Sequence, residues 1–305
     1  MELNVSKNTL LCQSSSFGID VTILSIRRLL QQQILASGRV AMPKGTELEL
    51  KSEAIPLNRL KHETTIIYRC AIAFRVARRQ TISPAEIAKQ FVTHLTTVSS
   101  AVSNQPQLDF TVRIVEPGWI DFNLSDRALA VWLQQLLEFP IPNSQFPIPN
   151  SQFPIPYCLF PIQYAHARCC SLLRLGHRES LIQLHDPNFS QPIGQWLNPN
   201  PIPWFSPSLE SGNFQLVHPT EKQLIFQLLA VVDRLEDARA VPGFQLAAGL
   251  SQAFSNFERS CRICGEVKQK TPELSQARLG LIAITQLLLR SLLQKQIGIA
   301  APTEL

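Results

Sequence analysis

The chain has 305 residues, of which 45% are hydrophobic, and its formal net charge at pH 7 is +5. This length allows about two domains, each with a hydrophobic core of its own. No apolar run reaches the roughly 18–20 residues that cross a bilayer, which argues against a membrane-spanning protein. Residues 1–20 lack the basic start and apolar block of a signal peptide, so we expect a cytoplasmic protein with no membrane partner.

Positive charge is in small surplus and is spread along the chain. Residues 1–138 carry 15 Lys and Arg against 12 Asp and Glu, and residues 157–305 carry 13 against 11. A mild surplus on both halves permits an RNA partner without demanding one. Charge alone therefore assigns no function.

The first segment is predicted to mix helices and strands. Apolar residues at helical spacing predict one helix over 21–37, with Gly38 as its C-cap, and another over 66–80. Alternation of polar and apolar residues predicts an exposed strand over 46–54.

Capping residues mark two further helices, and a hairpin lies between them. Ser83 is a candidate N-cap, with Pro84 at the first helical position and Glu86 completing a capping box. Ser125 is the candidate N-cap of the next helix, and two strand-like runs joined by a Pro-Gly turn precede it. The predicted helices cover 81–98 and 126–138, and the predicted strands cover 108–116 and 118–125.

The second segment is predicted to be almost wholly helical. Helical patterns cover 161–176, 221–238, 244–261 and 273–296. Thr220 and Gln223 form a candidate capping box for the second of these helices. Six prolines fall in the loop 177–218, and we assign it no structure. The sequence therefore predicts an α+β N-terminal domain, a small antiparallel sheet with helices, followed by an all-α bundle of four helices.

A proline-rich repeat separates the two segments. The heptad Phe-Pro-Ile-Pro-Asn-Ser-Gln occurs twice from Phe139 and starts a third time at Phe153. Proline removes backbone donors and favours polyproline II, in which 19 residues could span about 60 Å. We expect a domain at 1–138, a linker at 139–157 and a second domain at 158–305. Our hypothesis for the repeat is duplication of a short DNA segment.

The second domain resembles a known family. The run "QYAHARCCSLLRLG" closely resembles the helix that opens the DALR-type anticodon-binding domain of arginyl-tRNA synthetases. The likeness continues through "LAVVDRLEDA", "LAAGLSQAFSNFERSCRICGE" and "ARLGLIAITQLLLRSLLQKQIGIAAPTEL", and it covers about residues 157–305. The resemblance implies a DALR-type helical bundle that contacts the tRNA anticodon. That family commonly ends in Met, whereas Leu305 stands here.

The first domain resembles the N-terminal additional domain of the same enzymes. The runs "AIAFRVARRQTISPAEIAKQF" and "VRIVEPGWIDFNLSDRALAVWL" match its Ala-rich helix, its helix start and its hairpin, in that order. The resemblance implies contact with the tRNA elbow. Thr65, Ile66 and Cys70 stand where the family has Gly, Asp and Asn, which argues against full inheritance of that contact.

The class I catalytic domain, which lies between these two modules in the family, has no counterpart here. The sequence contains neither a His-x-Gly-His segment nor a Lys-Met-Ser-Lys-like loop, and 19 residues cannot form the sheet that carries them. No Ser/His/Asp set or Gly-rich phosphate loop appears either. We therefore expect a non-catalytic relative without cofactors, although homology alone would label it an arginine–tRNA ligase.

The candidate tRNA-binding residues fall in two groups. Arg75, Arg78 and Arg79 share one face of a predicted helix, where they could contact phosphates or simply be solvated. In the helical domain a Tyr can stack on an unpaired base and an Arg can bind a phosphate or a base edge, but both could instead tie the helices together. The candidates there, by their place in the resemblance, are Gln163, Tyr164, Arg168 and Arg278. For His166 and Arg174 we favour the structural role.

The cysteines give no metal site. Seven cysteines at irregular spacing fit a reducing compartment better than a disulfide framework. Cys261 and Cys264 form a CxxC pair, but a structural zinc needs four ligands and no second pair is suitably spaced. We expect neither metal nor cofactor, and a local redox pair is the remaining alternative.

Three functional hypotheses follow. The first is a non-catalytic arginyl-tRNA synthetase paralog that binds tRNA, with arginine tRNA as the expected partner. The second is a protein-interaction module that docks on a synthetase or another partner. The third is an accessory that acts in trans on a separate arginine–tRNA ligase.

Overall fold

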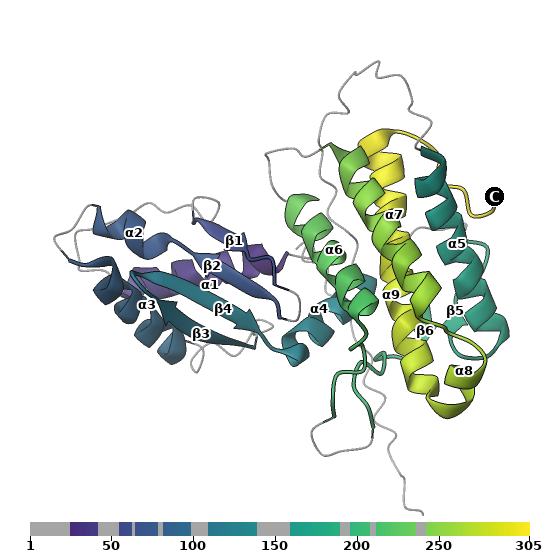
Figure 1. The fold of residues 1–305 in the computed structure, drawn as a ribbon, viewed down its shortest axis with the longest axis horizontal. Coiled ribbons are helices and arrows are strands. Elements are labelled where there is room, and N and C mark those ends of the chain that lie inside the picture. Colours follow the sequence, from purple (N-terminus) through teal and green to yellow (C-terminus); the bar gives the residue numbers. More distant parts are fainter. Residues whose placement is uncertain are drawn as a thin grey trace, which may run out of the picture.

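The computed structural model describes residues 25–41, 55–62, 65–78, 82–98, 109–138, 159–189, 196–207, 212–235 and 242–305. These residues form an α+β domain and a helical domain that lie side by side (Figure 1). The expected fold class is confirmed. The repeat at 139–157 and the strand expected at 46–54 lie outside the described residues. Within the described ranges, no helix is long and apolar enough to cross a membrane.

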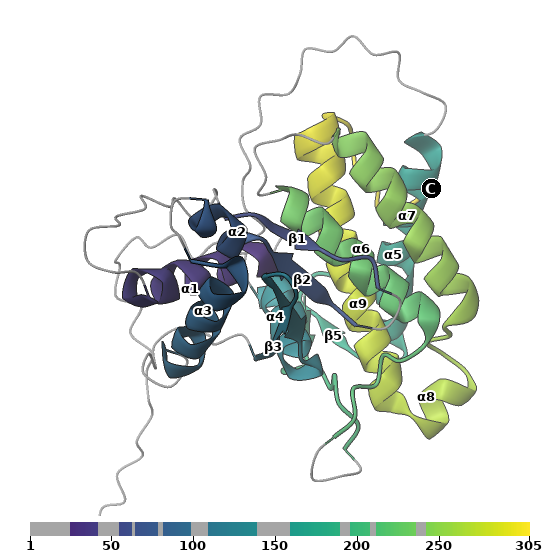
Figure 2. The same ribbon diagram turned by 60° about the vertical axis from the view of Figure 1, so that its left-hand side comes forward.

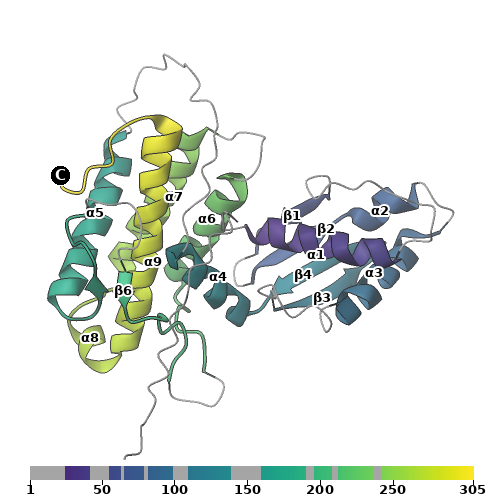
Figure 3. The same ribbon diagram turned by 180° about the vertical axis from the view of Figure 1, so that it is seen from behind.

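The α+β domain is built on a four-stranded antiparallel sheet in the order β1-β2-β4-β3. Helices α1 and α3 pack against each other across one side of this sheet (Figure 3). The strands are β1 (Leu57–Arg59), β2 (Ile67–Cys70), β3 (Phe110–Val115) and β4 (Trp119–Leu124). The helices are α1 (Ile26–Ala41), α2 (Ile72–Ala77), α3 (Pro84–Val98) and α4 (Asp126–Glu138).

The two serine N-caps predicted for this domain are confirmed. The Ser83 hydroxyl accepts the backbone N–H of Glu86 at 3.3 Å and caps α3. The Ser125 hydroxyl accepts the N–H of Ala128 at 3.1 Å and caps α4. The predicted hairpin is confirmed as β3 and β4, paired in register from Phe110 to Trp119.

Two predictions for this domain are wrong. Helix α1 does not end near Gly38 but continues to Ala41. Residues 67–70, assigned to a helix, form strand β2, and α2 covers only 72–77. Strand β2 pairs with β1 and with β4, so tertiary pairing overrides the local helical pattern there.

Four long helices form the core of the second domain, as predicted. They are α5 (Leu159–Arg178), α6 (Pro219–Leu235), α7 (Gly243–Ser260) and α9 (Pro272–Ser291). A short α8 (Glu266–Lys270) precedes α9, and a π-helical turn (Leu292–Ile297) follows it. Helix α5 continues past Gly176, where a Cβ would come within 2.8 Å of the Leu279 side chain, so glycine permits the close approach of α5 and α9.

The expected capping box of α6 is wrong. The helix begins at Pro219, one residue before the expected cap Thr220. The Glu221 carboxylate instead accepts the N–H of His218 at 2.8 Å. The carboxylate of Glu221 thus satisfies a backbone N–H at the start of the helix, which is the role that was expected of Thr220 and Gln223.

The proline-rich loop contains ordered structure that the sequence did not predict. Strands β5 (Gln183–Leu184) and β6 (Trp196–Asn198) pair, and Phe205 bridges to Phe214. The Gln134 side chain on α4 accepts the N–H of Ile202 at 3.1 Å and the indole N–H of Trp204 at 3.2 Å. The loop is therefore attached to the end of the α+β domain.

A buried polar contact joins the two domains. The Tyr68 hydroxyl on β2 donates to Oδ2 of Asp233 on α6 at 2.7 Å, and the Arg27 backbone N–H lies 3.4 Å from Oδ1. Tyr68 is 0% exposed and Asp233 is 5% exposed. Burial raises the pKa of both groups. The Arg59 guanidinium adds a hydrogen bond of 2.7 Å to the Phe226 carbonyl on α6. Hydrogen bonds from Tyr68 and Arg59 to α6 therefore hold the two domains together.

Candidate nucleic-acid interface

An exposed aromatic pair marks the first turns of α5. Phe160 is 62% exposed and Tyr164 is 48% exposed, which is unusual for such large rings. Their spacing of four residues places them on one helix face, with ring centroids 6.2 Å apart and planes inclined by 28°. The pair presents two ring faces on which an unpaired base could stack.

The C-terminal segment runs alongside this helix and is held by its side chains. Gln163 donates to the Ala300 carbonyl at 3.1 Å, His166 lies 2.7 Å from the Pro302 carbonyl, and Arg174 donates to the Thr303 carbonyl at 2.8 Å. These contacts fix backbone carbonyls of the segment next to the aromatic pair. Gln163, a predicted tRNA-binding residue, therefore positions the segment.

His166 has a structural role, as the sequence favoured. Its side chain is 0% exposed, and burial lowers its pKa to about 4, so the ring is neutral at pH 7. Nδ1 donates to the Pro302 carbonyl, which leaves Nε2 to accept from the Gln286 amide at 2.9 Å. The ring thus bridges α9 and the C-terminal segment.

Arg168 sits on the same helix and is paired within the bundle. Its Nε donates to the Glu258 carboxylate on α7 at 2.5 Å, and 39% of the Arg168 side chain is exposed. The pair ties α5 to α7. The Arg168 guanidinium has further N–H donors that could bind a phosphate, so its role in tRNA binding stays a prediction.

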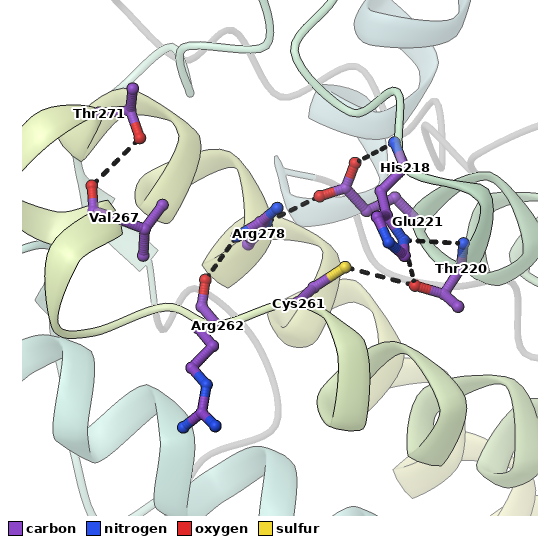
Figure 4. A network of polar contacts seen from close by, with 8 residues as sticks. All are labelled: His218, Thr220, Glu221, Cys261, Arg262, Val267, Thr271 and Arg278. Carbon is purple, nitrogen blue, oxygen red and sulfur yellow. Dashed lines mark hydrogen bonds and ion pairs between the residues drawn. The ribbon is translucent and has the colours of Figure 1, made fainter.

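Arg278 on α9 lies in a network of polar contacts with residues at the start of α6 and after α7 (Figure 4). Its Nε donates to Glu221 at 2.7 Å and its Nη1 donates to the Arg262 carbonyl at 2.6 Å. The side chains of Arg278 and Glu221 are 12% and 1% exposed. This geometry favours the structural alternative for Arg278, since a buried carboxylate needs the partner cation.

The CxxC pair belongs to the same region. Cys261 and Cys264 are free thiols, and Cys261 lies 3.3 Å from the Thr220 hydroxyl. Burial raises the pKa of both thiols, which keeps them protonated and poorly nucleophilic at pH 7. Over the described ranges, no group of three or more His, Cys, Asp or Glu side chains is placed to hold a metal ion.

The basic residues predicted in the α+β domain are placed only in part. Arg75 and Arg78 are exposed and stand at i and i+3, with Arg78 as the C-cap of α2. Arg79 lies outside the described residues. The structure brings neither Arg75 nor Arg78 near the aromatic pair, because α2 lies at the far end of the other domain (Figure 1).

Sequence reasoning missed Phe160. The residue precedes the quoted family-like run and is separated from Tyr164 by one helical turn. The available signal was the spacing of four residues between Phe160 and Tyr164, which places both rings on one helix face. It was missed because Phe160 closely follows the proline-rich repeat and was not assigned to the helix.

The helical domain is similar in sequence to known proteins. The sequence model of the DALR anticodon binding domain matches residues 162–305. The arginine–tRNA ligase of Synechococcus sp. (strain JA-3-3Ab) is 29% identical over 143 residues, and that of Moorella thermoacetica (strain ATCC 39073 / JCM 9320) is 32% identical over 143 residues. No solved structure matches the chain.

These matches cover part of each protein. They span 46% of this chain and 21% of each relative, and the matched family segment lies in the helical domain alone. The likeness of the α+β domain to the synthetase additional domain therefore stays a prediction. Residues 162–305 are thus similar to the DALR anticodon binding domain and to a segment of two arginine–tRNA ligases.

Proposed function

We propose that the chain binds tRNA through its helical domain, with Phe160 and Tyr164 stacking on unpaired bases. The observation that carries this proposal is the exposed aromatic pair, Phe160 and Tyr164, at the start of the segment that matches the DALR domain. Single-stranded bases are commonly held on such rings, and each stacked base contributes about 1–3 kcal/mol. The carbonyls of the adjacent C-terminal segment can accept hydrogen bonds from base edges.

The proposed role does not include amino-acid activation. The sequence between the two domains holds a 19-residue repeat in place of a class I catalytic domain, and neither phosphate-binding signature occurs anywhere in the chain. Without a Gly-rich phosphate cradle, ATP has no backbone site of the usual kind. ATP–pyrophosphate exchange by the purified protein would contradict this part of the proposal.

The α+β domain is proposed to add a second contact, at the tRNA elbow. Arg75 and Arg78 are exposed, and Arg79 follows them in sequence. Because the Tyr68–Asp233 contact holds the domains together, binding of one tRNA by both modules would need less ordering of one domain relative to the other. Arginine tRNA is the proposed partner by relationship to the arginine–tRNA ligases.

The test is a filter-binding titration against arginine tRNA and two unrelated tRNAs at two salt concentrations. We expect binding that weakens with salt and prefers arginine tRNA. Phe160→Ala combined with Tyr164→Ala should weaken it by about 10-fold or more. Tyr164→Phe is the matched control, since it keeps the ring. Absence of binding at low salt would overturn the proposal and favour docking on a synthetase.

A further inference from the structure

A groove lies where the α+β domain meets α6. Its volume is about 720 Å³, within the range of ligand-binding clefts. One wall comes from β1 and the segment after it, and the other from α6, which lie close together in the view of Figure 2. The lining residues belonging to the first wall are 58–62, 65 and 66, and those of the second are 223, 226, 227, 230, 233 and 234.

The groove is electropositive. Four cations line it, two of them on the α+β wall, one at the start of α1 and one on α6: Arg59, Lys61, Arg27 and Arg234. Among the described lining residues the one carboxylate is Asp233, which is 5% exposed and accepts the Tyr68 hydroxyl. Low-dielectric walls on both sides concentrate the field of these cations in the groove.

Arg59 has a structural role in the groove, whereas two other cations, Lys61 and Arg234, are exposed to solvent. Arg59 donates to the Phe226 carbonyl and lies 6.0 Å over the Phe226 ring, so it braces the domain contact. Lys61 and Arg234 are both exposed and stand on opposite walls. The sugar–phosphate backbone of a nucleic acid lying between Lys61 and Arg234 would contact one cation from each domain.

The neutral side chains of the groove suit the same ligand. Asn58 and Gln223 are exposed amides, one on each wall, and Thr65 adds an exposed hydroxyl. Amides and hydroxyls bond phosphate oxygens and ribose hydroxyls without reading base sequence.

We propose that this groove binds the sugar–phosphate backbone of the RNA, with Lys61 and Arg234 as its phosphate contacts. The inference rests on the proposed function, because the RNA is the tRNA bound by the helical domain. It adds a contact surface formed by both domains together, distinct from the aromatic pair on α5 and from the arginines of α2.

The experiment compares two charge-reversal variants of the full chain. Lys61→Glu combined with Arg234→Glu changes the groove, and Arg259→Glu combined with Arg262→Glu changes two exposed cations at the α8 end of the bundle by the same total charge. All four residues are exposed, so both variants should fold, which thermal unfolding checks. tRNA affinity is then measured as a function of salt.

The groove variant should bind at least about 10-fold more weakly at low salt, with the slope of log K against log salt reduced by about 1 for each lost phosphate contact. The control should keep the wild-type slope. Wild-type binding with equal slopes for the two variants would overturn the groove while leaving the proposed function intact. Absence of wild-type binding would overturn both.

Discussion

Buried His166 predicts a specific loss of stability in acid. Its pKa is about 4 in the folded protein, below the ordinary 6.5, because burial disfavours the charged ring. The unfolded chain therefore binds the proton more tightly. The contribution of His166 is fully present above pH 6.5 and falls as the pH drops toward 4.

The magnitude follows from the two pKa values. The pKa of His166 is 6.5 in the unfolded chain and about 4 in the folded protein. The free energy of unfolding should therefore be about 2 kcal/mol lower at pH 5 than at pH 8, and about 3 kcal/mol lower in the acid limit. Burial is the main cause, and the positive charge of Arg290 adds to it. In addition, both ring nitrogens of a protonated His166 would be donors. The Gln286 amide, which donates to Nε2, must then turn or lose its bond.

The assay is urea unfolding at a series of pH values for the wild type and for His166→Asn. Asparagine can still donate to the Pro302 carbonyl but does not titrate, so other groups that titrate in acid cancel in the comparison. We expect the wild type to lose about 2 kcal/mol more than the variant between pH 8 and pH 5. Parallel stability curves for the two proteins would refute the reasoning.

Three further substitutions test the packing. Tyr68→Phe should lower the free energy of unfolding by about 1–3 kcal/mol in urea, because the buried Asp233 carboxylate loses its hydroxyl donor. Glu221→Ala should cost about 3–5 kcal/mol by the same measurement, since the Arg278 guanidinium would be left in a buried site. Gly118→Ala should lower the melting temperature by several degrees, because φ is +150° there and a Cβ would lie 2.7 Å from the start of α3.

A surface ion pair supplies the control for these variants. Lys270 and Glu266 are paired at i and i+4, and their side chains are 72% and 76% exposed. Glu266→Gln should change the unfolding free energy by less than about 0.5 kcal/mol. A loss as large as that of Glu221→Ala would mean that burial does not set the cost of these pairs.

The elements that were predicted correctly are those fixed by neighbours in sequence. Ser83 and Ser125 begin helices because each side chain bonds an N–H three residues ahead. Strand β2 was missed because its partner residues on β4 lie 50 or more positions away in sequence, and a short apolar run fits either a helix or a strand. Part of the order in the proline-rich loop comes from Gln134, which lies 68 residues before its partner Ile202.

The candidate site was predictable in the same limited sense. Tyr164 could be named from its motif, and its exposure agrees with a stacking role. The environment of Arg278 could not be foreseen, because Glu221 stands 57 residues earlier in the chain. The groove depends on two domains meeting through Tyr68 and Asp233, which are 165 residues apart. No local pattern encodes such a meeting.

The domain contact also bears on how much the length of the heptad repeat affects folding. Since Tyr68, Arg59 and the start of α1 already hold the α+β domain on α6, the connecting sequence need not set the distance between the domains. Closure entropy grows slowly with loop length, so one additional heptad on 19 residues would cost only about 0.3 kcal/mol. On this argument, adding or removing one heptad should change the free energy of unfolding by only a few tenths of a kcal/mol.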